Sequence, residues 1–154
     1  SDAEEVAENI LLKAQREAEE KKLPYMANLL ANVAFDISIS GQMAHQIVKA
    51  AEALTYRQLC LLALFSGLVE FPLRATDYRS KGSFPPELIQ ILYECYDLEN
   101  RGFVSTGSTP VFGPTDINPS ITRVQGLGAF MFNLMGLAQI SVSELNPLVA
   151  QLGE

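Results

Sequence analysis

The chain has 154 residues and a formal net charge of −7, and 48% of its residues are hydrophobic while 19% are charged. This length suits one domain that can bury a core, and the composition excludes a disordered chain. The acidic balance argues against nucleic acid or anionic lipid as partners, because both select basic surfaces.

Two features of the sequence bear on its location. No signal peptide is visible, and no apolar run reaches the roughly 20 residues that a membrane helix needs, so we expect no membrane contact. The only cysteines, Cys60 and Cys95, lie inside apolar runs. We interpret them as buried free thiols, which predicts a cytoplasmic protein.

The first predicted element is an amphipathic helix over residues 2–22. Its apolar side is made by Val6, Ile10, Ala14 and Ala18, which recur every four residues, with Ala3, Ala7 and Leu11 beside them. Because the remaining face is charged, the apolar side must be covered for the helix to be stable. We expect it to pack on the domain's own core or across a two-fold axis against a second copy, with the second arrangement favoured.

Leu23-Pro24 predicts the end of that helix, since proline has no amide hydrogen to donate. A second helix then begins at Pro24 and runs to about Ser38. Its apolar stripe contains small residues that allow close helix packing: Ala27, Leu30, Ala31, Ala34 and Phe35. A third helix is expected over residues 42–53. Thr55 then caps a fourth helix, YRQLCLLALFSGL, which is apolar nearly all round and is therefore expected at the centre of the fold.

The second half of the chain alternates loops with shorter elements. Residues 70–83 are polar and predict a loop or a short helix, after which Pro85-Pro86 begins a fifth helix that Gly102 ends. GFVST and SITRV predict a β-hairpin. Its long loop, residues 107–120, holds three prolines and two glycines and is expected to be exposed and mobile. A last large helix covers about residues 126–138, and a short tail helix over SELNPLVAQL follows despite Pro147.

These elements predict a mainly α fold, α+β at most, in a single domain over residues 1–154. We divide it into N-terminal helices over residues 1–53, a winged-helix-like half over residues 54–140 that carries the hairpin, and a C-terminal tail over residues 141–154. The middle part resembles bacterial winged-helix domains, because a helix, a connector and a second helix precede the hairpin. The stretches 100–104 and 124–128 match the usual strand and helix entries, except that Gln125 stands where a capping Thr is common.

The N-terminal half carries a second resemblance. LPYMANLLANVAFD is followed by a helix and then by ALTYRQLCLLALF. This pattern is similar to the abortive-infection alpha family and related bacterial phage-defence proteins. The resemblance covers about two thirds of the chain and implies a role in phage defence. It transfers no catalytic residue.

We predict no catalytic, cofactor-binding or metal-binding residue. A zinc site or a Cys–His nucleophile pair would require the only histidine, His45, to meet Cys60 or Cys95. We interpret His45 as a structural histidine and both thiols as protonated, because their surroundings are apolar. Gly126-Leu127-Gly128 precedes a helix and could present amides to an anion, but two glycines alone are a weak signal.

Charged side chains give one candidate site. Arg74, Arg79 and Lys81 form a basic cluster in the connector before the fifth helix. They are candidate phosphate contacts; the alternative is a set of solvated loop charges offset by Glu70 and Asp77. The carboxylate pairs Glu4–Glu8 and Glu94–Asp97 are interpreted as solvated helix faces rather than as acid–base groups.

The sequence therefore favours a non-enzymatic interaction or sensing module, dimeric, with the N-terminal helix or the hairpin loop as its contact surface. One alternative is a winged-helix DNA-binding regulator. The helix over residues 86–101 argues against it, because its outward side is acidic. The other alternative is a small-molecule pocket lined by Tyr93, Phe130, Met131, Phe132 and Met135, although such residues at helical spacing are usually core.

Overall fold

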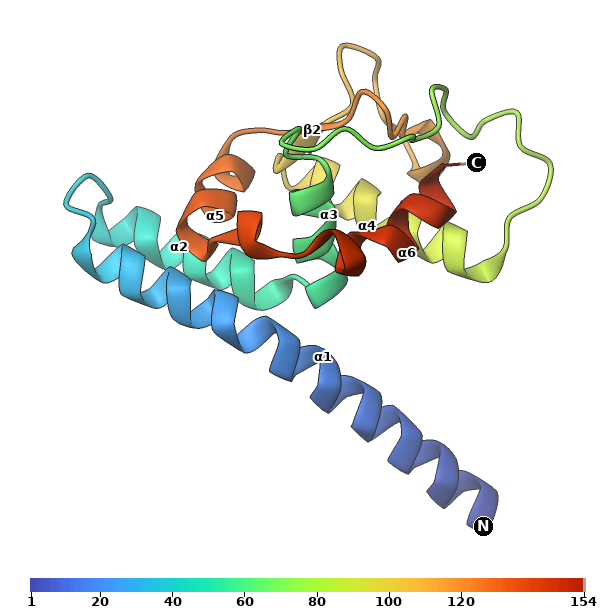
Figure 1. Ribbon diagram of the computed structural model, residues 1–154, viewed down its shortest axis with the longest axis horizontal. Coiled ribbons are helices and arrows are strands. Elements are labelled where there is room, and N and C mark those ends of the chain that lie inside the picture. The colour runs from blue at the N-terminus through green and yellow to red at the C-terminus, as the bar shows by residue number, and fades with distance from the viewer. Residues whose placement is uncertain (154) are drawn as a thin grey trace.

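The structure, a computed structural model, describes residues 1–153 and is mainly helical with one small antiparallel hairpin, which confirms the expected fold class (Figure 1). A long helix runs diagonally beneath a body formed by the other elements. In chain order the elements are α1 (Asp2–Phe35), α2 (Gly41–Ala53), α3 (Tyr56–Leu64), α4 (Pro86–Asn100), β1 (Val104–Ser105), the 3-10 helix η1 (Pro114–Asp116), β2 (Arg123–Val124), α5 (Leu127–Met135), the 3-10 helix η2 (Leu137–Gln139) and α6 (Val142–Leu152).

Helix α3 is the centre of the core, as its apolar sequence predicts. Every residue from Gln58 to Leu64 is buried, and the helix contacts α1, α4, α5 and α6. It begins with a capping box, because the Thr55 hydroxyl accepts from the Gln58 amide at 3.0 Å and the Gln58 side chain accepts from the Thr55 amide at 3.1 Å. The predicted cap is therefore confirmed, and it fixes where α3 starts.

Helix α1 corrects the predicted break at Leu23-Pro24. One continuous helix contains Pro24 in its interior. Proline frees the carbonyl of residue 20 from its usual partner, which is tolerated here because Glu20 and Pro24 are both exposed and water can reach that carbonyl. The expectation of two helices, over residues 2–22 and from Pro24 onward, was therefore wrong.

The face that α1 buries is not its small-residue stripe. The small-residue stripe expected to allow close helix packing is exposed at every position: Ala27, Leu30, Ala31, Ala34 and Phe35. The residues that pack against the body lie on the opposite side, with Leu29 fully buried and Tyr25, Met26 and Val33 partly buried. A window with apolar residues on both sides of a helix does not show which side meets the core.

The hairpin follows α4, in the predicted order. Strands β1 and β2 pair antiparallel, with Val104 opposite Val124 and Ser105 opposite Arg123. Gly128, at the start of α5, lies so close to β1 that an added Cβ would stand 2.1 Å from the Phe103 carbonyl oxygen. This glycine therefore permits a close helix–strand contact, which accounts for it without an anion.

The hairpin loop is less exposed than its composition predicts. Its apex, residues 107–110, is exposed, but Ile117 is fully buried and Pro119 is buried as well. The expectation of an exposed loop over all of residues 107–120 was therefore wrong for its second part, where η1 turns the chain back toward the core. The tail helix is confirmed as α6, with Pro147 inside it. Among residues 1–153, no helix is both long and apolar enough to cross a membrane.

Candidate protein-interaction surface

Helix α1 consists of two parts with different surroundings. Residues 1–20, which we call the arm, project away from the body to the N-terminus (Figure 1), and each of them is exposed. Residues 21–35, the docked half, lie against α2, α3 and α5. Within the described chain, the side chains of arm residues form hydrogen bonds and ion pairs only within the arm: Ser1 with Glu4, Gln15 with Glu19, and Lys13 with Glu17.

Polar side chains hold the docked half by binding carbonyl oxygens at the ends of neighbouring helices. Lys22 donates to the carbonyls of Glu52 at 3.1 Å and Leu54 at 2.5 Å, at the end of α2. Asn28 and Asn32 donate to the last carbonyls of α5, at 3.0 Å and 2.7 Å. Such carbonyls lack a partner within their own helix, so each contact satisfies an otherwise free acceptor. Burial lowers the pKa of the Lys22 ammonium.

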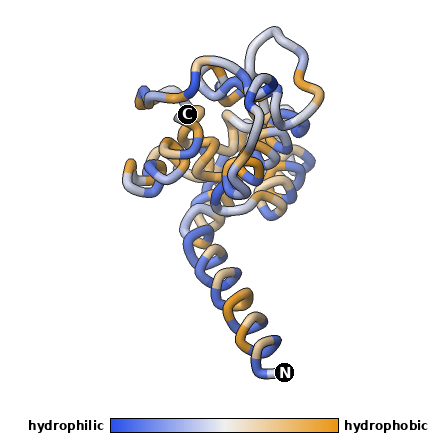
Figure 2. Tube along the Cα trace, turned by 90° about the vertical axis from the view of Figure 1, so that its right-hand side faces the viewer, coloured by the Kyte–Doolittle hydropathy of each residue, from blue (hydrophilic) through white to orange (hydrophobic). Residues whose placement is uncertain are grey.

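The arm presents to solvent the same helical face that the docked half buries. An α-helix returns to the same orientation after five turns, or about 18 residues. Leu11 therefore points the same way as Leu29, yet 70% of Leu11 is exposed and none of Leu29. The other arm residues on this face, which we call the arm stripe together with Leu11, are Ala3, Ala7, Ile10, Ala14 and Ala18. Figure 2 shows an apolar band midway along the projecting helix.

This exposure rules out one of the two arrangements expected for the N-terminal helix. The stripe over residues 2–22 was expected to pack on its own core or against a second copy. The structure leaves residues 1–20 exposed, so packing on the own core was wrong. Pairing across a two-fold axis stays a prediction.

A groove separates the base of the arm from the body, and we call it the arm groove. It is lined by Ala14, Glu17, Ala18 and Lys21 of α1, and by Thr55, Tyr56, Arg57, Gln90 and Glu94 of the body, around a hollow of about 540 Å³. Lys21 closes its inner end, because its ammonium lies 3.5 Å from a Glu144 carboxylate oxygen and 5.6 Å from the Tyr56 ring centroid.

The body side of the arm groove is held rigidly. Arg57 binds Glu94 through two hydrogen bonds, at 2.7 Å and 3.1 Å, and both side chains are mostly buried. This two-point geometry is the strong form of an arginine–carboxylate pair. A smaller apolar pocket adjoins the groove around Ile91 and Leu148 and reaches Cys60. Burial raises the pKa of the Cys60 thiol to about 11, so the thiol is protonated and unreactive at neutral pH.

The residues considered for a metal or nucleophile site do not meet. His45 is exposed on α2, whereas Cys60 and Cys95 are buried on α3 and α4. Burial also raises the pKa of Cys95. Among residues 1–153, no three His, Cys, Asp or Glu side chains are grouped so that they could hold a metal ion. The five residues considered for a small-molecule pocket are divided, since Met131 and Met135 are fully buried while Tyr93 and Phe130 are largely exposed.

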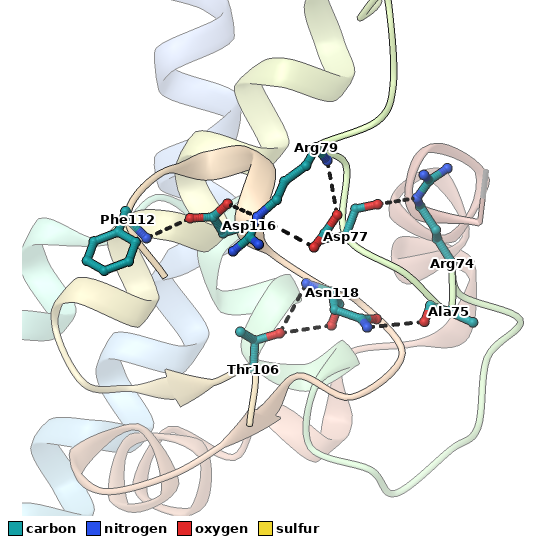
Figure 3. Close-up of polar contacts among 8 residues, drawn as sticks. All are labelled: Arg74, Ala75, Asp77, Arg79, Thr106, Phe112, Asp116 and Asn118. Atoms are coloured by element: carbon teal, nitrogen blue, oxygen red, sulfur yellow. Dashed lines mark hydrogen bonds and ion pairs between the residues drawn. The ribbon is translucent and has the colours of Figure 1, made fainter. Parts of the chain in front are cut away.

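The basic cluster joins the connector to the hairpin loop. Arg79 Nε donates to Asp116 at 2.6 Å and lies 3.6 Å from an Asp77 carboxylate oxygen (Figure 3). Arg74 Nε donates to the Asp77 carbonyl at 2.9 Å. The hydrogen bond from Arg79 holds the pKa of Asp116 below its usual range. Lys81 lies partly buried in the same connector. Phosphate binding by Arg74, Arg79 and Lys81 stays a prediction.

A second contact between these loops explains why the hairpin loop turns inward. The Asn118 side chain donates to the Ala75 carbonyl at 3.1 Å, and its backbone amide donates to the Thr106 hydroxyl at 3.0 Å (Figure 3). The Tyr78 amide donates to the Thr115 carbonyl at 2.8 Å. These bonds satisfy the polar backbone around Ile117, so that this side chain can be buried.

Helix α4 presents a less acidic outer side than its sequence suggests. Glu94 is bound to Arg57, and Asp97 accepts hydrogen bonds from Gln58 at 2.7 Å and Arg101 at 2.9 Å. Glu99 accepts from the Thr106 amide at 3.1 Å. Burial raises the pKa of the Glu99 carboxyl. These carboxylates therefore hold α4 to α3 and to the hairpin.

Sequence reasoning missed the anchors of the docked half. Lys22, Asn28 and Asn32 follow the same side of α1, and the two asparagines stand four residues apart in a stretch without any charge. Polar residues at helical spacing within an apolar stretch were the available signal.

No family model, curated protein or solved structure matches this chain.

Proposed function

We propose that this domain is a protein-interaction module without catalytic activity, and that the arm is its contact element. One observation supports this most strongly: the arm stripe lies on a helix whose residues 1–20 are all exposed in the described chain. An isolated helix of about 20 residues is only marginally stable in water. A partner that covers the stripe would bury its apolar side chains and so stabilise the helix.

The partner that fits the arm is an amphipathic helix of another protein. Alanines form most of the stripe, and small side chains let a second helix approach closely. The arm groove extends the stripe onto the body, where Tyr56 offers an aromatic contact and the Arg57–Glu94 pair a rigid polar rim. A helix that lies along the stripe and ends in this groove would bury apolar area in the middle and keep its charges at the edges.

A role in phage defence is part of this proposal. It rests on the resemblance of the LPYMANLLANVAFD and ALTYRQLCLLALF stretches to the abortive-infection alpha family. These stretches cover most of the docked half of α1 and all of α3, which are elements that hold the base of the arm. The resemblance thus concerns the support of the proposed contact element rather than a catalytic centre.

Photo-crosslinking in the native cell tests the proposal. A benzoylphenylalanine at Leu11, on the stripe, should give a discrete adduct with another protein, whereas the same probe at Asn9, on the opposite side, should give little. Leu11→Asp should reduce crosslinking from a probe at Ala14 at least tenfold. Leu12→Asp is the matched control, because Leu12 is also exposed but lies off the stripe. Adducts of equal yield from both faces, or adducts with a second copy alone, would contradict the proposal.

A further inference from the structure

The outward side of the docked half is an uncharged apolar surface. From Leu23 to Phe35 the chain has no charged residue. Leu23 is 62% exposed, Leu30 55% and Phe35 86%, and Ile37 just beyond the helix is fully exposed. We call this surface the outer face; it consists of Leu23, Ala27, Leu30, Ala31, Ala34 and Phe35. Monomeric proteins rarely leave contiguous apolar patches larger than roughly a few hundred Å² exposed.

We propose that a second copy of this chain covers the outer face, through antiparallel pairing of the two docked halves about a two-fold axis. This surface lies on the side of α1 opposite to the arm stripe, so the inference goes beyond the proposed function. It also moves the expected dimer contact from residues 2–22 to residues 23–35.

The sequence of the outer face is complementary to itself in one antiparallel register. Leu23, Ala27, Leu30 and Ala34 are spaced by four, three and four residues, which is the spacing of a helix–helix seam. With the two-fold axis level with the Asn28–Leu29 peptide, Leu23 faces Ala34 of the second copy and Leu30 faces Ala27. Each level of the seam then pairs one large with one small side chain, the arrangement that fills space between closely packed helices.

Charge favours the antiparallel direction. The arm holds seven acidic residues (Asp2, Glu4, Glu5, Glu8, Glu17, Glu19 and Glu20) and two basic ones (Lys13 and Arg16), a difference of five negative charges. A parallel pair would bring two such arms side by side, and like charges at that distance repel. The antiparallel pair sends the arms to opposite ends, and the uncharged outer face forms the contact.

The end of α1 borders an open hollow that the proposed pairing does not fill. Asn32, Phe35, Asp36 and Ile37 surround an open hollow of about 520 Å³ together with Asn133 and Leu134. Ala34, which faces Leu23 of the second copy in the proposed register, does not line this hollow. The dimer leaves the hollow and the two arm stripes free.

Disulfide crosslinking tests both the contact and its register. In the antiparallel register, residue 23 of one copy meets residue 34 of the other, whereas the two residues at position 23 are separated by 11 residues, about 16 Å along the axis. Leu23→Cys mixed with Ala34→Cys should form an intermolecular disulfide under mild oxidation, and neither variant should do so alone, since Cα atoms farther apart than about 7 Å cannot be bridged. The native thiols are buried and do not compete. Equal crosslinking of either variant with itself would overturn the register.

Sedimentation equilibrium tests the contact independently of the arm. The unmodified chain should be a dimer, and Ala27→Glu with Leu30→Glu should weaken dimerisation by about 100-fold or more, because it would bury unpaired carboxylates. Both positions are exposed within the single chain, so folding should be unaffected, as circular dichroism would verify. Leu12→Glu, on the arm, should leave the dimer intact. A monomer at all concentrations, or a dimer that needs Leu11 but not Leu30, would overturn the inference without bearing on the arm as a contact element.

Discussion

The two halves of α1 are the most informative comparison within this molecule. They belong to one helix and share one face, yet the docked half buries that face and the arm leaves it in water. The docked half has no charge between Leu23 and Phe35, whereas the arm has charged residues along its length except at residues 9–12. The helix therefore obtains its stability at one end from the body and at the other end from its cap and from local ion pairs.

The comparison teaches that helical periodicity and burial are separate properties. Leu11 and Leu29 satisfy the same pattern, and only the presence of α5 and α3 beside the docked half makes their surroundings different. A stripe indicates that one face is suited to a contact. Whether that face is covered by the same chain or by another one depends on which elements of the fold lie beside it.

Truncating matched leucines should produce the largest difference between the two halves. Leu29→Ala should lower the free energy of unfolding by about 2–5 kcal/mol, because it removes buried methyl groups and leaves a cavity. Leu11→Ala, on the same face five turns earlier, should change it by less than about 0.5 kcal/mol. Urea denaturation of dilute protein measures both. Equal losses for the two variants would show that the arm is packed within its own chain.

Replacing Pro24, near the boundary between the arm and the docked half, should have an intermediate effect on the free energy of unfolding, of the opposite sign. Pro24→Ala restores an amide donor for the carbonyl of residue 20, and proline is about 3 kcal/mol less favourable than alanine inside a helix. Part of this stabilisation is offset because alanine leaves the unfolded chain more conformational freedom than proline does. We therefore expect the free energy of unfolding, measured by thermal unfolding, to rise by about 1–2 kcal/mol. Pro147→Ala in α6 is the control, and only Pro24→Ala should increase the helicity of the arm. A loss of stability in Pro24→Ala would mean that Pro24 itself stabilises α1.

Removing an anchor should have the smallest measurable effect. Asn32→Ala leaves the Leu134 carbonyl without its 2.7 Å hydrogen bond, and we expect a loss of about 1 kcal/mol because water can partly replace the donor at this exposed position. Asn9→Ala, on the exposed arm, should be neutral or slightly stabilising, since alanine is the better helix former. A loss in Asn9→Ala as large as in Asn32→Ala would place a contact on the arm that the structure does not contain.

Much of the fold was predictable because its signals are local. The Thr55 cap, the start of the apolar YRQLCLLALFSGL helix, the Pro86 start of α4 and the two short strands each depend on neighbouring residues, and all were found at or near the predicted positions. The YRQLCLLALFSGL helix ends at Leu64, earlier than predicted. The predicted break at Pro24 failed because a proline ends a helix only when the freed carbonyl cannot be satisfied, and here solvent reaches it. That condition is tertiary, so composition alone does not contain it.

The candidate site was predictable only in part, for the same reason. The arm stripe was found as a pattern, because alanines and leucines at helical spacing are visible in one window. The outer face was predicted only as a stripe whose small residues allow close helix packing, because the sequence does not show which helix it meets. The body wall of the arm groove joins Tyr56, Gln90 and Glu94 from two helices, and no window of sequence holds them together.

Amide hydrogen exchange along α1, measured on dilute protein without partners, tests the central claim most directly. The account predicts a sharp boundary near Lys21 and Lys22. Amides of residues 5–20 should be protected by less than about tenfold, as expected of a helix that opens locally, and those of residues 25–35 by about 1,000-fold or more. Uniform strong protection from residue 5 to residue 35 would contradict it, because the arm would then be held by its own chain.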